Sequence, residues 1–357
     1  MPAEAPPGAA LVVLNVRAQG GRAAALEPRL ADMLRKHHPG VALQAVDGVK
    51  AARRAIGALP RGSRVVLVGG DGTVHQMLPA LLEGGHTMGL VPAGSGDDTA
   101  RALGLRGLDP LRALSRALTG EPRRIDIGWV STEHEQRPFL SSLAAGFDAA
   151  VAQRALQGPR VLRGLPRYLL ATLRELAALQ QHMLVLGVDG RTVHEGPALF
   201  ASTLATPTYG GGMPASPQAK LDDGQLDLLV AGRFGRPGVL AMLPRLLAGR
   251  HLGHPQVGLH RFSVMTLQAE ADVPLAADGE AMTAARRVTV RVGRGLREWS
   301  LPAAVTERRV EIHWRGRLDR IDARIDHRSV LTSVAPIADG MPVPSILSPS
   351  PNSAESY

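Results

Sequence analysis

The sequence predicts an α/β domain with a parallel sheet, followed by a β-rich C-terminal domain. Two patterns support this fold class. Up to about residue 120, short apolar runs alternate with stretches of helical periodicity, which is typical of a parallel sheet covered by helices on both faces. Beyond that point, strand-like segments are separated by turn residues. A length of 357 residues also favours two domains over one.

The N-terminal domain is placed at residues 1–125. Its apolar runs, such as Val-Val-Leu-Val at 65–68, do not alternate with polar residues, as expected for strands buried on both faces. Strands are predicted at 10–15, 41–46, 64–69 and 87–92, and helices at 21–36, 49–57, 73–83, 97–104 and 109–119.

The C-terminal domain is placed at residues 126–304. One amphipathic helix is predicted over 160–180, where Pro166 either kinks the helix or marks its true start. The remaining segments are strand-like and lie at 123–131, 137–148, 182–190, 198–205, 226–232, 262–270, 273–280 and 287–293. The tail, residues 305–357, has a partly helical, basic first part. Its second part is rich in Pro and Ser and is predicted to be disordered.

Composition narrows the class of protein. The chain has no cysteine, which excludes disulfides and fits a reducing cytosol. The start lacks a basic signal-peptide region, and no apolar run approaches 18 residues, so no membrane span is expected. The net charge is +9, and residues 286–328 hold 12 Arg against 6 Asp or Glu. Such a surface suits anionic lipids or nucleotides. Nucleic acid is not favoured, because aromatic residues make up only 3% of the chain.

Two glycine-rich turns follow neighbouring strands of the predicted parallel sheet. The first reads Gly-Gly-Asp-Gly-Thr over 69–73, and the second reads Gly-Ser-Gly-Asp-Asp over 94–98. Ligands bind at the carboxyl ends of strands in open α/β sheets, and backbone N–H groups in such turns favour phosphate. Asp71 would repel phosphate unless a cation such as Mg²⁺ lies between them. The alternative is a tight βα turn in which Asp71 only caps a helix.

Several common site motifs are absent from the sequence. It contains neither a Walker A loop nor G-x-G-x-x-G, and neither H-E-x-x-H nor G-x-S-x-G. These absences argue against a P-loop enzyme, a Rossmann dinucleotide site, a zinc protease and a serine hydrolase.

The two turns resemble the catalytic domain of diacylglycerol kinases and related bacterial lipid kinases, a family that shares GGDGT with NAD kinases. Further similar segments are AAGFDAAV at 144–151, TYGGGMPASPQAKLDDGQLDLLVAG at 208–232 and AADGE at 276–280. The resemblance covers about residues 9–300. It implies an NAD kinase-like α/β domain and a sandwich-like second domain. The chain departs from the family where Ser95 replaces Thr and Asp97 replaces Asn.

The resemblance implies roles for particular residues. Glu280, Asp278 and Asp71 would be the catalytic residues: Glu280 as the general base, Asp278 in the same turn, and Asp71 helping to hold the Mg²⁺ that arrives with ATP. A structural Mg²⁺ would bind the side chain of Asp223. The metal site would also include Asp222 and backbone carbonyls near Lys220 and Gln225. The nucleotide would contact Asn15, Gly69, Gly70, Asp71, Gly72, Thr73, His75, Gly94, Ser95, Gly96 and Asp97.

The sequence therefore predicts an ATP-dependent lipid kinase. Its acceptor would be diacylglycerol or a related lipid alcohol, such as a sphingoid base. We expect a cytoplasmic protein that is peripheral at the inner face of the membrane and contacts an anionic membrane surface; a homodimer is left open. Two alternatives remain: an NAD kinase-like enzyme with a soluble acceptor, or a non-catalytic relative that binds nucleotide or lipid.

Overall fold

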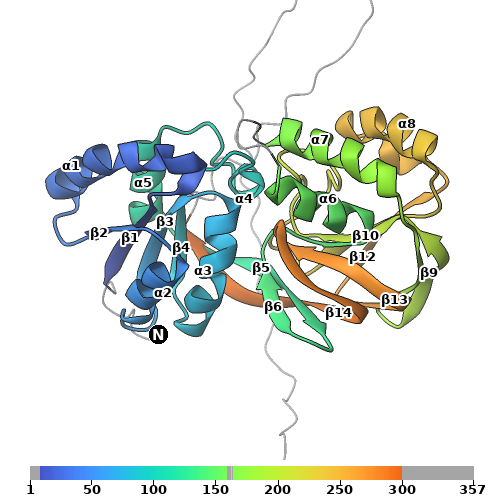
Figure 1. The fold of residues 1–357 in the computed structure, drawn as a ribbon. Helices are drawn as coiled ribbons and strands as arrows, with labels where there is room; N and C mark the ends of the chain where they lie inside the picture. The colour runs from blue at the N-terminus through green and yellow to red at the C-terminus, as the bar shows by residue number, and fades with distance from the viewer. Residues whose placement is uncertain (1–8, 159–161, 163, 300–357) are drawn as a thin grey trace, which may run out of the picture. The chain divides into compact units, whose positions relative to one another are not determined.

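The computed structural model describes residues 9–158, 162 and 164–299 (Figure 1). The side chains of residues 294–299 are not included in this description. The predictions for residues 305–357, and for part of the start of the helix predicted at 160–180, lie outside the described residues.

The N-terminal half is a parallel α/β sheet, as predicted. Its strands pair in the order β2-β1-β3-β4, and every pairing between them is parallel. The strands are β1 (Ala10–Asn15), β2 (Ala42–Val46), β3 (Arg64–Gly69) and β4 (Thr87–Pro92). The helices are α1 (Glu27–His37), α2 (Val49–Gly57), α3 (Asp71–Glu83), α4 (Asp98–Ala102) and α5 (Pro110–Thr119), with a 3₁₀ segment at Ala18–Leu26.

Both faces of this parallel sheet are buried. Alternate strand residues point to opposite faces, so Val65 and Leu67 pack with α2 and α3, whereas Val66 and Val68 pack with α1 and α5. All four of these side chains are fully buried. This explains why the strands read as continuous apolar runs.

The C-terminal half is mainly antiparallel. Its strands are β5 (Pro122–Thr132), β6 (Gln136–Phe139), β7 (Ser142–Ala145), β8 (His182–Val188), β9 (Arg191–Ala198), β10 (Phe200–Leu204), β11 (Leu226–Ala231), β12 (Val257–Phe262), β13 (Val264–Ala277) and β14 (Glu280–Trp299). The helices are α6 (Phe147–Leu156), α7 (Leu165–Glu175) and α8 (Arg236–Leu247), with 3₁₀ turns at Leu176–Ala178 and His251–Gly253. The end of β14 pairs in parallel with β4, so the sheet continues from one half to the other.

The predicted and observed elements differ at residues 137–148, which were predicted as one strand. Two short strands, β6 and β7, occupy this region, and Gly146 then turns the chain with a φ of +103° into helix α6. The segment at 144–151 is therefore largely helical. Its Ala-rich sequence carries little apolar periodicity, which is why the helix was missed.

Helices α7 and α8 also differ from the sequence reading. Helix α7 is shorter than predicted, and Pro166 lies in its first turn, so Pro166 marks the true start and does not kink the helix. Helix α8 was not predicted, because Pro237, Gly238 and Pro244 look like helix breakers. Strands β9 and β12 were also missed.

Candidate active site

A continuous pocket lies where the carboxyl ends of β3 and β4 face α6, α7 and the turn between β13 and β14. One end is polar and is formed by the two glycine loops, residues 69–73 and 94–98, which we call the cradle. The other end is lined by apolar side chains from α6 and α8, from strands β10, β11 and β12 and from the loops beside them, and we call it the apolar arm. The apolar arm consists of Phe147, Val151, Ala152, Ala155, Leu156, Leu199, Phe200, Ala231, Phe234, Val239, Met242, Leu243, Leu246 and Val257.

The two loops of the cradle touch each other. A Cβ atom on Gly70 would lie 2.6 Å from the Cα of Gly94, and a Cβ on Gly94 would lie 2.2 Å from Oδ1 of Asp97. Neither position has room for a side chain. The glycines at these two positions therefore allow the loops to form a single surface at neighbouring strand ends.

Asp71 joins the two loops through its carboxylate. Its oxygens accept hydrogen bonds from the backbone N–H groups of Asp98 (3.1 Å) and Thr99 (2.9 Å). Asp71 is the first residue of α3, yet the helix whose N–H groups it satisfies is α4. Its side chain also lines the pocket. Capping and a role at a ligand are thus compatible for this residue.

The end of β1 completes the polar wall. The side-chain amide of Asn15 donates to Oγ1 of Thr73 at 2.9 Å, and that of Gln19 donates to the carbonyl oxygen of Gly94 at 2.9 Å. Asn15 was predicted at this position, but Gln19 was not. Gln19 has a φ of +53°, a left-handed conformation that is uncommon for Gln and that the neighbouring residues do not predict.

Asp97 has left-handed backbone geometry, with a φ of +52°. Asn and Asp both tolerate this conformation, so the replacement of the family's Asn by Asp fits the backbone. Its Oδ1 atom is buried, and no hydrogen-bond partner for it is found among the described residues. Burial, reinforced by the charge of Asp71, raises the pKa of Asp97 to about 6.

Asp98, which was not among the predicted site residues, connects the cradle to the glycine-rich segment at 208–213. Its carboxylate accepts hydrogen bonds from the hydroxyl of Thr208 (2.7 Å) and from the backbone N–H of Gly211 (2.8 Å). Burial and the nearby charge of Asp71 raise its pKa. The Asp-Asp pair at 97–98 was the available signal for this residue.

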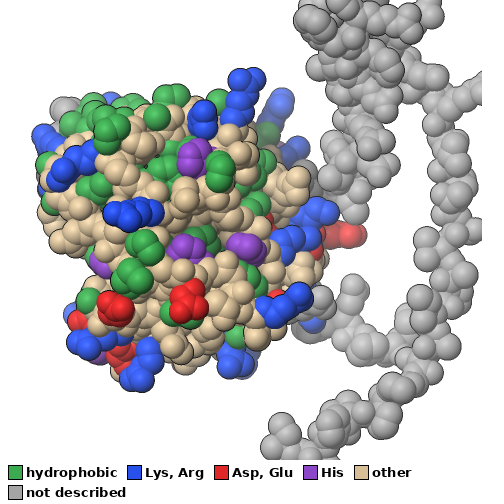
Figure 2. Space-filling model, turned by 90° about the vertical axis from the view of Figure 1, so that its right-hand side faces the viewer, with side chains coloured by type: hydrophobic (Ala, Val, Ile, Leu, Met, Phe, Trp, Pro, Cys, Tyr) green, Lys and Arg blue, Asp and Glu red, His purple; other side chains and the backbone are tan. Residues whose placement is uncertain are grey.

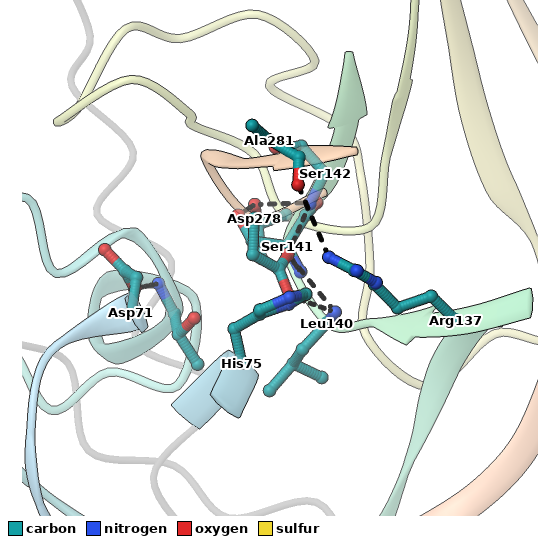
Figure 3. A network of polar contacts seen from close by, with 10 residues as sticks. Asp71, His75, Arg137, Leu140, Ser141, Ser142, Asp278 and Ala281 are labelled. Carbon is teal, nitrogen blue, oxygen red and sulfur yellow. Dashed lines mark hydrogen bonds and ion pairs between the residues drawn. The ribbon is translucent and has the colours of Figure 1, made fainter. Parts of the chain in front are cut away.

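Asp278 is the centre of a buried network (Figure 3). Its carboxylate accepts hydrogen bonds from the backbone N–H groups of Leu140, Ser141 and Ser142, the shortest being 2.7 Å, and lies 2.9 Å from Nδ1 of His75. The Asp278 side chain is only 3% exposed. This arrangement fixes the turn that carries Glu280 against α3 and the segment before β7.

Glu280 extends into the pocket beside the first glycine loop. A Cβ atom on Gly72 would lie 3.3 Å from Oε1 of Glu280. No hydrogen bond or ion pair of the Glu280 side chain is found in the part of the chain that the structure describes. Tyr168 lies close to the same turn, because a Cβ atom on Gly279 would lie 3.3 Å from its hydroxyl oxygen. Burial raises its pKa, with further contributions from the charges of Asp98, Asp71 and Glu280.

The predicted site residues do not all line the pocket. Gly69, His75 and Asp97 lie behind the lining residues, and His75 faces Asp278. The predicted structural-metal residues lie outside the pocket: Lys220, Asp222, Asp223 and Gln225.

The carboxylate of Asp223 is in contact with the guanidinium of Arg261 and accepts a hydrogen bond from the N–H of Gln225 at 3.1 Å. Arg261 also lies 3.6 Å from Asp227. A positive side chain therefore faces both of these carboxylates. Within the described ranges, no group of three or more His, Asp or Glu side chains is arranged to hold a metal ion. The structural Mg²⁺ stays a prediction.

Comparisons with known proteins match both halves of the chain. Residues 9–130 match the model of the diacylglycerol kinase catalytic domain, and residues 141–296 match that of the YegS C-terminal NAD kinase beta sandwich-like domain. Together they define a kinase class with an α/β half and a sandwich-like half.

A diacylglycerol kinase of Mycobacterium tuberculosis is 31% identical over 265 residues, which are 73% of this chain and 85% of that protein. One of Bacillus subtilis is 26% identical over 236 residues, which are 66% of this chain and 76% of that protein. A crystal structure of a diacylglycerol kinase from Bacillus anthracis covers 84% of this chain and 98% of its own, with a TM-score of 0.60 and 16% identity. The chain belongs to the diacylglycerol kinase family.

Proposed function

We propose that this chain is an ATP-dependent lipid kinase that transfers the γ-phosphate to the hydroxyl group of diacylglycerol or a related lipid alcohol. The observation that carries the proposal is that a single pocket joins the cradle, with Asp71 and Glu280, to the apolar arm. A nucleotide phosphate and an apolar chain can therefore occupy the same pocket from opposite ends.

The cradle suits the phosphates of ATP. The first turn of α3, from Asp71 to Thr73, lines the pocket, so the positive end of the helix dipole faces the ligand. Mg²⁺ that arrives with ATP needs only one or two carboxylates from the protein, and each Asp71 oxygen keeps a lone pair after its hydrogen bond to the backbone. When bound, the ion would neutralise charge on the transferred phosphoryl group.

Glu280 is our candidate for the general base. It has no hydrogen-bond partner among the described residues, it lines the pocket, and its Oε1 atom lies beside Gly72 of the cradle. As the lipid oxygen bonds to the γ-phosphorus, the bond from that phosphorus to the β–γ bridging oxygen breaks, and Glu280 takes the hydroxyl proton. Asp278 acts as a positioning residue, because backbone N–H groups and His75 surround its carboxylate.

The apolar arm suits the chain of a lipid. Its walls are largely one hydrophobic cluster, in which α6, α7 and α8 pack on β10 and β11. An apolar pocket of this kind favours a ligand that removes apolar surface from water.

Exposed leucines near the apolar arm suit a membrane surface. Leu173 of α7 is 53% exposed and Leu240 of α8 is 46% exposed. Arg174, Arg236 and Arg245 are exposed on the same helices. Hydrophobic and basic side chains gather along the upper part of the face in Figure 2, where α8 lies in Figure 1. No helix of the described residues is long and apolar enough to cross a bilayer. We therefore propose peripheral binding to an anionic membrane.

The test is transfer of labelled γ-phosphate from ATP into mixed micelles that contain diacylglycerol, with Mg²⁺ present. We expect label in the lipid phase. If another lipid of a total extract is labelled and diacylglycerol is not, the protein is a lipid kinase with a different acceptor. Label that appears only when NAD is added would contradict the proposal, and so would the absence of transfer to any acceptor.

A further inference from the structure

One ionisable side chain interrupts the apolar face of α6. The residues of α6 that line the pocket have the spacing of one helix face, and they are Phe147, Asp148, Val151, Ala152, Ala155 and Leu156. Asp148 is the only acid or base among them. A carboxyl group that faces an apolar binding pocket costs free energy unless it has partners.

The partners of Asp148 are both hydrogen-bond donors. The hydroxyl of Ser202 donates to Oδ2, and the backbone N–H of Ala149 donates to Oδ1 at 2.9 Å. Ser202 is fully buried and points to the same face of β10 as Phe200, which also lines the pocket. Burial raises the pKa of Asp148 to about 7, and these hydrogen bonds oppose that rise because they favour the ionised form. No cation contacts the carboxylate among the described residues.

A second acceptor, which has no partner among the described residues, belongs to a residue that lines the same pocket. His251 is 2% exposed, and its Nε2 atom lies 2.9 Å from the carbonyl oxygen of Ala215. That contact requires a proton on Nε2, and burial lowers the pKa of His251, so the ring is neutral and Nδ1 carries a lone pair. Nδ1 is buried and has no hydrogen-bond partner in the described part of the chain.

We propose that Asp148 and His251 form a specificity site that recognises a second hydrogen-bond donor on the lipid acceptor, besides the hydroxyl that is phosphorylated. The inference rests on the proposed function and names its substrate class. Diacylglycerol has only one donor, its single hydroxyl, which must face Glu280. A lipid alcohol with an additional hydroxyl, amide N–H or amine group can donate a hydrogen bond to one of these two acceptors. A monoacylglycerol and a long-chain amino alcohol are two such lipids.

The test compares three acceptors in matched micelles: a diacylglycerol, a monoacylglycerol and a sphingoid base of similar chain length. With the full-length protein, we expect kcat/KM to be about 10-fold or more higher for at least one of the donor-bearing lipids than for diacylglycerol. Asp148→Asn keeps the shape and removes the charge, so it should reduce that preference mainly through KM. The control Val151→Ala, on the same helix face, should weaken use of all three lipids alike.

Binding of the same lipids to the wild-type protein without ATP can be measured by calorimetry. This measurement depends neither on turnover nor on the folding of a variant. If the wild type binds a donor-bearing lipid more tightly but phosphorylates no lipid, the result contradicts the proposed function and supports the specificity site. If the protein phosphorylates diacylglycerol with a kcat/KM equal to or higher than that for the other two lipids, the result supports the proposed function and contradicts the specificity site. An Asp148→Asn variant that is folded and keeps the wild-type ratio would also overturn the specificity site.

Discussion

The cradle and the apolar arm are the two ends of one pocket, and they are built in different ways. The cradle uses residues that are close in sequence, within 69–73 and 94–98, and the fold brings the two loops into contact. The apolar arm draws its side chains from two helices, α6 and α8, and from strands and loops between residues 199 and 257. Under the proposed function, phosphate chemistry is therefore encoded by short motifs, whereas recognition of the acceptor depends on residues scattered along the chain.

The two ends also differ in physical character. The cradle depends on close backbone approach and on charge, so small changes there should act on turnover and on nucleotide use. The apolar arm depends on apolar area, and changes there should act on binding of the acceptor. The following predictions test this division, from the largest expected effect to the smallest.

Replacing Glu280 with Gln should have the largest effect. The amide cannot take the hydroxyl proton, so kcat should fall by about 10²- to 10⁴-fold while nucleotide binding survives. Steady-state kinetics and titration with a fluorescent ATP analogue would check this. The exposed Glu270→Gln is the matched control and should behave as wild type. Near-normal turnover of Glu280→Gln would show that another group accepts the proton.

Replacing Asp278 with Asn should destabilise the protein. The variant keeps the size of the side chain but weakens its hydrogen bonds from three backbone N–H groups and the contact with His75. Because the site is buried, we expect a loss of about 2–3 kcal/mol in the free energy of unfolding, measured by urea denaturation. An unchanged midpoint with a large loss of turnover would instead make Asp278 a catalytic residue.

Replacing Asp97 with Asn should stabilise the protein at neutral pH. The folded pKa of Asp97 is about 6, above its ordinary value of 3.8, so folding favours the protonated form. The stability that this group contributes is present below about pH 4 and is lost as the pH rises through 6. Asn at this position should therefore raise stability by about 1 kcal/mol at pH 8, because solvent screens part of the effect.

The gain from Asp97→Asn should vanish below about pH 3, where Asp97 is protonated in both the folded and the unfolded state. Melting curves of the two proteins across this range give the comparison. A pH-independent difference between them would show that the carboxyl group does not titrate in this window.

Replacing Asp223 with Ala should have the smallest effect, because Asp223 lies outside both ends of the pocket. Its contact with the half-exposed Arg261 contributes up to about 1 kcal/mol. The change in melting temperature between Mg²⁺ and a chelator should then be small, and it should be the same for the wild type and the variant. A Mg²⁺-dependent stabilisation of the wild type alone would instead support the structural metal site predicted from the sequence.

The sequence predicted the parallel half of the fold and most of the cradle. Buried strands are visible in the sequence as unbroken apolar runs. The two turns are visible because glycines stand beside acidic residues in GGDGT and GSGDD. Contacts over long separations could not be predicted. Gln19 meets Gly94 from 75 positions away, and Asp148 meets Ser202 from 54. Helix α6 was missed because its alanines suit several environments, and α8 because its prolines suit a helix only at particular positions.

The most direct test of the division between the two ends is a comparison of Gly94→Ala with Leu243→Ala, measuring KM for ATP and for the lipid in each. A Cβ at Gly94 collides with Gly70 and Asp97 in the cradle, whereas Leu243 lines only the apolar arm. We predict that Gly94→Ala raises KM for ATP by about 10-fold or more and that Leu243→Ala raises only KM for the lipid, by a similar factor. Equal effects of both variants on both substrates would contradict a pocket with two separate ends.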